Sequence, residues 1–186
     1  FEKLDELFLK RIDLCVKNIT EMFEKYNYTN VKLEIERLFW RDFCDNYLEL
    51  VKKRVYNSTG DKKISAQYTL YKSLLTILKL ISPIMPFITE EIYQTYFRKL
   101  EKDKSIHISK WPEFDKKTKN TEELDILFSD LSMIRQEKTK AQKPMNAEII
   151  LTLKGSLKRY DGLMDDLKNV TNAKEIKTGE FKVEFV

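Results

Sequence analysis

The chain has 186 residues, enough for one domain with its own core or for a main domain with a smaller one attached. Apolar residues make up 42% of it and include 11 Phe, 9 Tyr and 2 Trp, which excludes wholesale disorder, while only 4 Gly and 4 Pro favour long helices. Its 34 Lys and Arg against 30 Asp and Glu give a net charge of +4, too small to indicate a nucleic-acid partner unless the charges cluster.

The sequence shows no signal peptide and no apolar run that is long enough to cross a membrane. Cys15 and Cys44 lie at apolar helix positions without CxxC spacing, so we interpret both as reduced thiols of the core. These features predict a cytoplasmic protein with no membrane partner. The chain opens on Phe1 rather than Met, from which we expect a fragment of a longer protein.

Apolar spacing over the first hundred residues predicts an antiparallel bundle of helices. A first helix is expected over about Glu2–Lys25, and a second from Thr29 or Asn30 to about Tyr56, because apolar residues recur every three or four positions in both. A third is expected over Ala66–Ile81 with Ser65 as its N-cap. That helix is apolar nearly all round, which is typical of a central position in a bundle.

The second predicted helix carries a broad apolar stripe against which other helices can pack. Prominent members of this stripe are Phe39, Trp40, Phe43, Tyr47 and Val51. We interpret Trp40 and Trp111 as structural because both lie among apolar residues. Asp42 and Asp45 fall off the stripe and are interpreted as surface charges of the helix. For Asp45 we expect a structural role, in which it meets a cation or a backbone donor.

Two prolines divide the third predicted helix from a fourth. Pro83 ends the third helix, and Pro86 suits the first turn of a helix that continues to about Leu100. The segment Ser105–Ser109 alternates between polar and apolar residues and predicts a short extended piece ahead of Trp111.

A polar linker at Lys116–Asn120 is expected to separate the bundle from a small α+β unit. The elements predicted after it are a helix capped by Thr121 that runs to about Lys140, a strand over Glu148–Leu153, a helix through Leu157–Leu167, and a hairpin of Ala173–Lys177 with Phe181–Val186. The predicted fold is therefore mainly α, with a helical-bundle domain over residues 1–115 and a small C-terminal α+β subdomain over residues 121–186.

Residues that carry chemistry are few. His107 is the only histidine, which leaves almost nothing for a metal site or a catalytic triad, and the scattered glycines form no phosphate-binding loop. Glu90 and Glu91 form a carboxylate pair that we interpret as helix-surface charge. We therefore predict no catalytic residue, metal or cofactor in this chain, and an RNA-modifying enzyme is disfavoured.

Two clusters of basic residues lie at the ends of predicted helices. One brackets the loop after the second helix, close to Tyr56, and the other brackets the end of the fifth helix. Their members are Lys52, Lys53, Arg54, Lys62 and Lys63 in the first cluster, and Arg135, Lys138, Lys140 and Lys143 in the second. Such clusters are either solvated helix ends that complement the macrodipole, or contacts for RNA phosphates beside aromatic residues that stack on bases.

Four stretches, in order, resemble the anticodon-binding domain of valyl-tRNA synthetases. They are FWRDFCDNYLELVKKRVY, YTLYKSLLTILKLISPIMPFITEEIYQ, SIHISKWPEFD and MIRQEKTKAQKPMNAEIILTLKG. The first contains an F-C-D-x-Y-L-E core that favours the valyl family over the related leucyl and isoleucyl ones. The resemblance covers essentially the whole chain, and its wording is closer to archaeal-type enzymes than to bacterial ones.

The resemblance implies that this piece docks the anticodon stem-loop of the valine tRNA. The catalytic motifs of the family are missing, so the ATP- and magnesium-dependent joining of valine to tRNA, and editing, would belong to upstream catalytic and editing domains. From charge and position we expect contacts in three groups. These are Lys52, Lys53, Arg54 and Lys63 to the RNA backbone, Arg41 and Tyr56 to anticodon bases, and Arg135, Lys138 and Lys143 as a second contact surface.

Two alternatives of other kinds remain open. The chain can be a helical protein-interaction module, for example one that assembles a complex of several synthetases; an exposed apolar patch without a basic rim would favour this. It can also be the equivalent domain of an isoleucyl- or leucyl-tRNA synthetase, which shares the bundle and parts of the proline motif.

Overall fold

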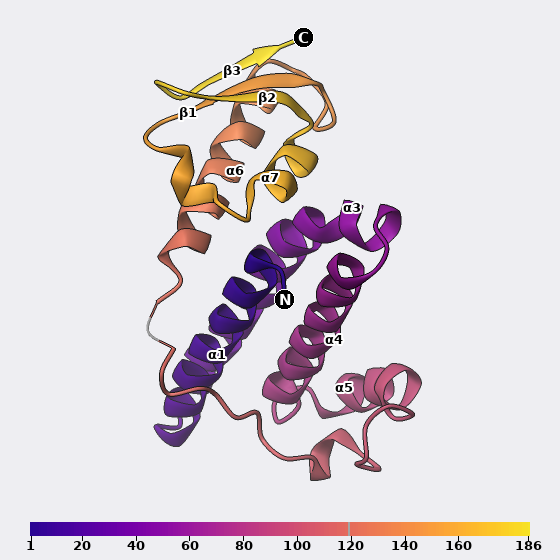
Figure 1. Cartoon of the computed structure of the whole chain (residues 1–186). Coiled ribbons are helices and arrows are strands. Elements are labelled where there is room, and N and C mark those ends of the chain that lie inside the picture. The colour runs from indigo at the N-terminus through magenta and orange to yellow at the C-terminus, as the bar shows by residue number, and fades with distance from the viewer. Residues whose placement is uncertain (119) are drawn as a thin grey trace. The chain divides into compact units, whose positions relative to one another are not determined.

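The structure of the protein is a computed structural model that describes residues 1–118 and 120–186, and it is mainly helical, as predicted (Figure 1). The helical elements before residue 119 are α1 (Lys3–Glu24), α2 (Tyr28–Arg37), a π-helix (Leu38–Leu48), α3 (Glu49–Asn57), α4 (Asp61–Ile81), α5 (Pro86–Ile92), a second π-helix (Tyr93–Phe97) and a 3₁₀ turn (Ile106–Ile108). The elements after it are α6 (Glu122–Lys140), β1 (Ile149–Leu153), a 3₁₀ turn (Leu157–Tyr160), α7 (Met164–Thr171), β2 (Ala173–Thr178) and β3 (Lys182–Phe185).

The chain forms two compact units that do not follow its order. We call one the bundle unit; it consists of Phe8–Asp45 and Gln67–Asn120. The other, the sheet unit, consists of Phe1–Leu7, Asn46–Ala66 and Thr121–Val186. The separate folding of residues 1–115 and 121–186 stays a prediction. The linker predicted at Lys116–Asn120 includes residue 119, which lies outside the described residues.

The second predicted helix is confirmed in extent but not in regularity. Helical structure runs without a break from Tyr28 to Asn57, and Asn27 caps it by accepting a hydrogen bond from the backbone N–H of Asn30 at 3.4 Å. Its middle, Leu38–Leu48, is a π-helix. The i→i+5 hydrogen bonds of a π-helix widen the turn, so side chains there do not follow the 3.6-residue spacing that the sequence pattern assumed.

Three local predictions were wrong. The third helix begins at Asp61 rather than Ala66, so Ser65 lies inside α4 and its hydroxyl donates to Asp5 instead of capping a helix. Residues Ile106–Ile108 form a 3₁₀ turn rather than an extended piece, because the Ser105 hydroxyl accepts from the His107 backbone N–H. The helix expected through Leu157–Leu167 is divided at Gly162, whose φ of +74° a helix does not accept.

The predicted hairpin of the last two strands was also wrong. β1 lies between β2 and β3, parallel to β2 and antiparallel to β3, and α6 and α7 cover one face of this sheet (Figure 1). The turn after β2 crosses the end of β1, where the Gly179 backbone N–H bonds to the Leu153 carbonyl at 3.0 Å. A Cβ at Gly179 would lie 2.9 Å from Cγ2 of Thr152, so this crossing needs glycine.

Each unit has its own apolar core. In the bundle unit, buried residues of α4, the second π-helix and the 3₁₀ turn pack together; they are Leu75, Leu78, Tyr93, Phe97 and Ile106. In the sheet unit, the inward side chains of β1 are buried together with the apolar face of α6; they are Ile149, Leu151, Leu153, Leu124, Leu127, Leu131 and Ile134. The alternation of β1 and the helical spacing of α6 both predicted these inward faces.

A buried ionic network ties four segments of the sheet unit together. The Arg54 guanidinium donates to both carboxylate oxygens of Asp5, at 2.7 and 2.9 Å, and to Asp166 at 2.9 Å. Tyr47 and Ser65 also donate to Asp5 through their hydroxyls. All five side chains are buried. The network therefore joins four segments of the chain. They are the start of α1, the continuous helix of Tyr28–Asn57 near its C-terminal end, the start of α4, and α7.

Replacing Arg54 by Met is expected to lower the free energy of unfolding by about 3–5 kcal/mol, because two buried carboxylates would lose their cation. Urea unfolding of the wild type and the variant would measure this. The matched control is Lys53→Met, one residue earlier on the exposed face, which should stay within about 0.5 kcal/mol of the wild type. Equal stability of the two variants would contradict the role given to Arg54.

Asp166 should make the stability depend on pH. Burial raises the pKa of Asp166 from 3.8 to about 6, although Arg54 acts in the opposite direction. Over this range the folded protein holds a proton that the unfolded chain releases, so the contribution of Asp166 is full below about pH 4 and is lost as pH rises through about 6. Relative to Asp166→Asn, the wild type should lose up to about 3 kcal/mol between these limits. Urea unfolding at several pH values would measure this. If the free energies of unfolding of the wild type and Asp166→Asn change equally with pH, the role given to Asp166 is refuted.

Candidate nucleic-acid interface

The first basic cluster divides into exposed residues and one buried residue. Lys52 and Lys53 are exposed on α3, Tyr56 is 76% exposed, and Lys63 is half-buried near the start of α4. Lys52 also lies 3.2 Å from Glu49, a surface ion pair of little energetic weight. Arg54 is only 5% exposed and bonds to two carboxylates, so we correct its assignment: it is a structural residue and not a phosphate contact.

The second basic cluster divides in the same way. Lys143 is exposed, with its ammonium 6.0 Å from the centre of the Phe185 ring, and Arg135 is half-buried and donates to Asn46 at 3.0 Å. Lys138 is 1% exposed and donates three hydrogen bonds of 2.7 to 2.9 Å to main-chain carbonyls. These carbonyls belong to Met145, Ala147 and Thr171. Burial lowers the pKa of Lys138, and this lysine too is removed from the expected RNA contacts.

Arg41 belongs to the bundle unit, where the first π-helix changes the expected faces. Arg41 is exposed, and its Nε donates to Asp42 at 3.0 Å. Asp42 is buried and also lies 3.7 Å from Arg11, whereas Asp45 is exposed. The expectation of a surface Asp42 was therefore wrong, whereas Asp45 lies at the surface as expected. Trp40 is 62% exposed, with its ring edge-on to Phe39, so its expected place in the packed apolar stripe was wrong as well.

The bundle unit contains an aromatic groove of about 700 Å³ that the sequence pattern did not reveal. Its lining comes from three distant stretches of the chain, which are Thr20, Phe23, Glu24 and Tyr28, then Pro83 and Ile84, then Trp111. Trp111 is half-buried; its indole N–H donates to the Thr20 hydroxyl at 2.9 Å, and its ring meets Phe23 edge-on at 5.4 Å. Trp111 therefore has the predicted structural role and also lines a surface groove.

Two tyrosines extend the aromatic surface outward from this groove. Tyr28 is 52% exposed and lies edge-on to Phe23 at 6.0 Å. Tyr26 lies edge-on to Tyr28 at 6.3 Å and has a positive φ of 55°, which is uncommon for a residue with a side chain. Tyr26 in the turn after α1 and Tyr28 at the start of α2 thus present two tyrosine rings to solvent beside a partly covered Trp111.

Basic residues surround the other sides of Trp111. Lys79, Lys110 and His107 line one neighbouring hollow with Trp111, and Lys110 and Lys116 line another together with the carboxylate of Glu113. The bundle unit carries the whole net positive charge of the chain, because Lys and Arg equal Asp and Glu in number in the sheet unit. The groove itself is thus lined by aromatic rings with the carboxylate of Glu24, and lysines line the hollows on the other sides of Trp111.

Helix α5 fixes the loop that leads to Trp111. As predicted, Pro86 stands at the start of α5. Glu90 accepts hydrogen bonds from the Ser105 hydroxyl at 2.8 Å and the Ile106 backbone N–H at 3.1 Å, and a ring nitrogen of His107 lies 3.1 Å from the Pro86 carbonyl. Burial acts to raise the pKa of Glu90, but these hydrogen bonds and one from Gln94 outweigh it and lower the pKa. Glu90 is thus a bonded structural group rather than a free surface charge.

Other features bear on the remaining expectations. Cys15 and Cys44 are free thiols, and burial raises the pKa of Cys15 to about 12. Among the described residues, no three His, Cys, Asp or Glu side chains are grouped to hold a metal ion. In residues 1–118 and 120–186, no helix has the length and apolar character needed to cross a bilayer.

Comparison with known proteins identifies the family. The description of the anticodon-binding domain of tRNA ligases matches residues 5–153. The valine–tRNA ligase of Pyrococcus abyssi is 32% identical over 179 residues, which is 95% of this chain and 20% of that protein. Those of Orientia tsutsugamushi and Ehrlichia ruminantium (strain Gardel) are 35% and 38% identical, over 92% and 94% of the chain and 21% and 22% of each protein.

The chain therefore belongs to the family of anticodon-binding domains of tRNA ligases. It spans about a fifth of the length of the valine–tRNA ligases that it matches. These relatives include archaeal and bacterial proteins, so they do not separate the archaeal type from the bacterial one. The expected contacts of Arg41, Lys52, Lys53, Tyr56, Lys63, Arg135 and Lys143 stay predictions.

The exposed lysines of the first basic cluster give a direct test. If Lys52 and Lys53 contact tRNA phosphates, the double variant Lys52→Ala/Lys53→Ala should weaken binding of all tRNAs. The slope of log affinity against log salt should then fall by about 0.7 to 0.9 for each phosphate that is no longer neutralised. Arg54 is left unchanged because its replacement would destabilise the protein. The charge-matched control is Lys174→Ala/Lys177→Ala. A slope equal to that of the wild type would identify the cluster as a solvated helix end.

Proposed function

We propose that this chain is the anticodon-reading part of a valine–tRNA ligase. On this proposal it docks the anticodon stem-loop of the valine tRNA, in the cytoplasm. Upstream catalytic and editing domains of the same protein would use ATP and magnesium to join valine to that tRNA. Membership of the anticodon-binding family and the valine–tRNA ligase relatives support the proposal.

The aromatic groove of the bundle unit is the observation on which the docking proposal rests. Anticodon bases are single-stranded, and proteins hold such bases by stacking them on aromatic side chains while cations contact the backbone. Tyr26 and Tyr28 offer exposed rings beside the groove, and Lys79 and Lys110 line the hollow on another side of Trp111. One small region can thereby hold both a base and its phosphates.

Phosphates and bases would have separate tasks in this docking. The lysines would fix the position of the RNA, because phosphate contacts carry no sequence information. Discrimination among anticodons would come from polar groups that reach base edges inside the groove, where Thr20 and Glu24 are available. The Thr20 hydroxyl accepts from Trp111 and donates its own proton to the Val16 carbonyl at 2.7 Å, so towards a base it can act only as an acceptor, through its second lone pair.

The residues of this chain are expected to bind tRNA without charging it. The sequence carries neither of the ATP-site motifs of the parent family, and His107 contacts the Pro86 carbonyl and lies 3.8 Å from Glu90. ATP and magnesium would therefore act in the upstream domains, and we assign no residue of this chain to binding either of them.

One observation favours a protein partner as a second function. The start of α5 exposes Met85, Phe87 and Ile88, and the Phe87 side chain is 91% exposed. Consecutive exposed apolar residues of this kind mark interaction surfaces. A role in assembly with other proteins would require this apolar patch and not the groove, so variants can separate the two functions.

Tyr28→Ala should weaken binding of the valine anticodon stem-loop by about 5- to 150-fold, since stacking of one base is worth about 1–3 kcal/mol. The preference for the valine anticodon over a variant anticodon should also shrink. Fluorescence anisotropy with both labelled stem-loops would measure the two effects. Tyr96→Ala, which removes an exposed tyrosine that does not line the groove, is the control.

Two outcomes would contradict the docking proposal. Equal affinities of Tyr28→Ala and Tyr96→Ala would remove the groove as the base-binding site. Loss of stem-loop binding on Phe87→Ala with Tyr28→Ala unaffected would move the RNA contact to the start of α5.

A further inference from the structure

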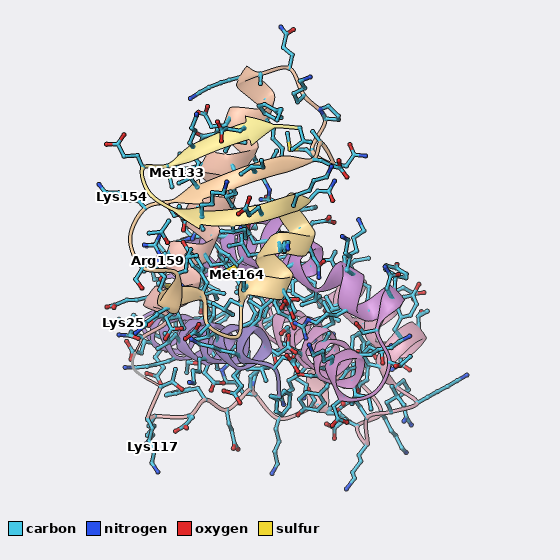
Figure 2. All side chains as sticks on the ribbon, turned by 45° about the horizontal axis from the view of Figure 1, so that its top comes forward. Lys25, Lys117, Met133, Lys154, Arg159 and Met164 are labelled. Carbon is cyan, nitrogen blue, oxygen red and sulfur yellow. The ribbon has the colours of Figure 1, made fainter. Side chains whose placement is uncertain are left out.

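The loop that follows β1 has a concentration of positive charge that no part of the preceding account uses. It runs from Lys154 to Arg159 with the sequence KGSLKR and contains three cations and no carboxylate. Lys154 and Lys158 are exposed, and Arg159 is half-buried. Figure 2 shows Lys154 and Arg159 on the same side of the sheet unit. The loop lies just beyond residues 5–153, which the family description matches.

Lys154 and Lys158 differ from the lysines of the neighbouring sheet in having no carboxylate partner. Within residues 1–118 and 120–186, no Asp or Glu oxygen is placed within 4 Å of either ammonium group. By contrast, the three sheet lysines each meet a glutamate at 2.6 to 3.1 Å; the pairs are Lys174–Glu148, Lys177–Glu175 and Lys182–Glu184. The charges of these three sheet lysines are therefore neutralised locally, and those of Lys154 and Lys158 are not.

The Arg159 guanidinium is held in a fixed plane beside these two lysines. It lies over the Tyr160 ring, with Cζ 4.8 Å from the ring centre, and Nη2 is 3.6 Å from Asp130. Tyr160 and Asp130 are both buried and hydrogen-bonded to each other, so they form a rigid support. Because the fork of donors is oriented before binding, little conformational entropy is lost when it meets a phosphate.

The backbone of the loop keeps the approach to this guanidinium open. Gly155 has a φ of +87°, and the position that its Cβ would take lies 3.7 Å from Nη1 of Arg159. The Ser156 hydroxyl accepts from the Lys158 backbone N–H at 3.2 Å, which fixes the turn that carries Lys158. A side chain at residue 155 would both strain the backbone and lie against the guanidinium.

We propose that the Lys154–Arg159 loop is a second RNA contact, one that binds the phosphodiester backbone of the tRNA outside the anticodon bases. This inference rests on the proposed tRNA-docking function. The loop offers two mobile point charges and one oriented guanidinium, which suits successive phosphates of a strand, and it has no exposed aromatic ring on which a base can stack. It would add affinity and orientation without adding anticodon specificity.

Salt-dependent tRNA binding tests the loop. For Lys154→Ala/Lys158→Ala, the slope of log affinity against log salt should fall by roughly 1.4 to 1.8, the sum for two phosphate contacts. The preference for the valine anticodon should stay unchanged. The control Lys174→Ala/Lys177→Ala removes the same charge from the same unit, but from lysines of β2 that are already paired, and should keep the wild-type slope. Arg159→Lys should weaken binding further, because an ammonium cannot replace the oriented fork.

The outcomes separate this inference from the function on which it rests. If the wild type binds tRNA and both double variants keep the wild-type slope, the loop is not an RNA contact and the docking proposal stands. If the loop variant lowers the slope while Tyr28→Ala removes anticodon preference without changing the slope, both proposals are supported. If the wild type binds no tRNA at any salt concentration, the docking function fails and the loop proposal fails with it. Circular dichroism of each variant confirms that it is folded.

Discussion

The Arg54 guanidinium lies between two buried carboxylates, and the packing of the sheet unit depends on its charge. Asp5 comes from the first turns of the chain and Asp166 from α7, and each would be an uncompensated buried charge without Arg54. Burying such a charge alone costs far more than a surface ion pair returns, so the network specifies which segments must meet. It thereby fixes α3, which carries Lys52, Lys53 and Tyr56 on its exposed face.

The spacing of apolar residues predicted most of the helices, because each helix packs through the face on which those residues recur. The apolar faces of α1 and α6 are buried largely as expected, the stripe of α4 is buried at Ile77 and Leu78, and α6 ends at Lys140 as predicted. The main failure lies in the first π-helix, where the wider turn rotates each residue away from the position that a 3.6-residue repeat assigns. This explains why Trp40 is exposed while Asp42 is buried. The neighbours of β1 could not be predicted either, because alternation marks a strand without naming its partners.

Charged residues show the limit of sequence interpretation at the candidate site. Arg54 and Lys138 continue the inward spacing of Tyr47 with Leu50 and of Leu131 with Ile134, which was an available signal that each cation faces the interior. The aromatic groove gave no such signal, since Phe23, Pro83 and Trp111 are far apart in sequence and meet only in the folded bundle unit. Loop lysines such as Lys154 became informative only when the partners of neighbouring lysines were known.

The interleaving of the sheet unit along the chain has a consequence for how such domains can evolve. The last third of the chain supplies Asp166 and the sheet, but the cation that neutralises Asp166 is encoded more than a hundred positions earlier, and Asp5 stands near the start. Recombination that exchanged only the C-terminal stretch between relatives would therefore combine mismatched buried charges. Asp5, Arg54 and Asp166 should be inherited together, so that substitutions at one of these positions are followed by substitutions at the others.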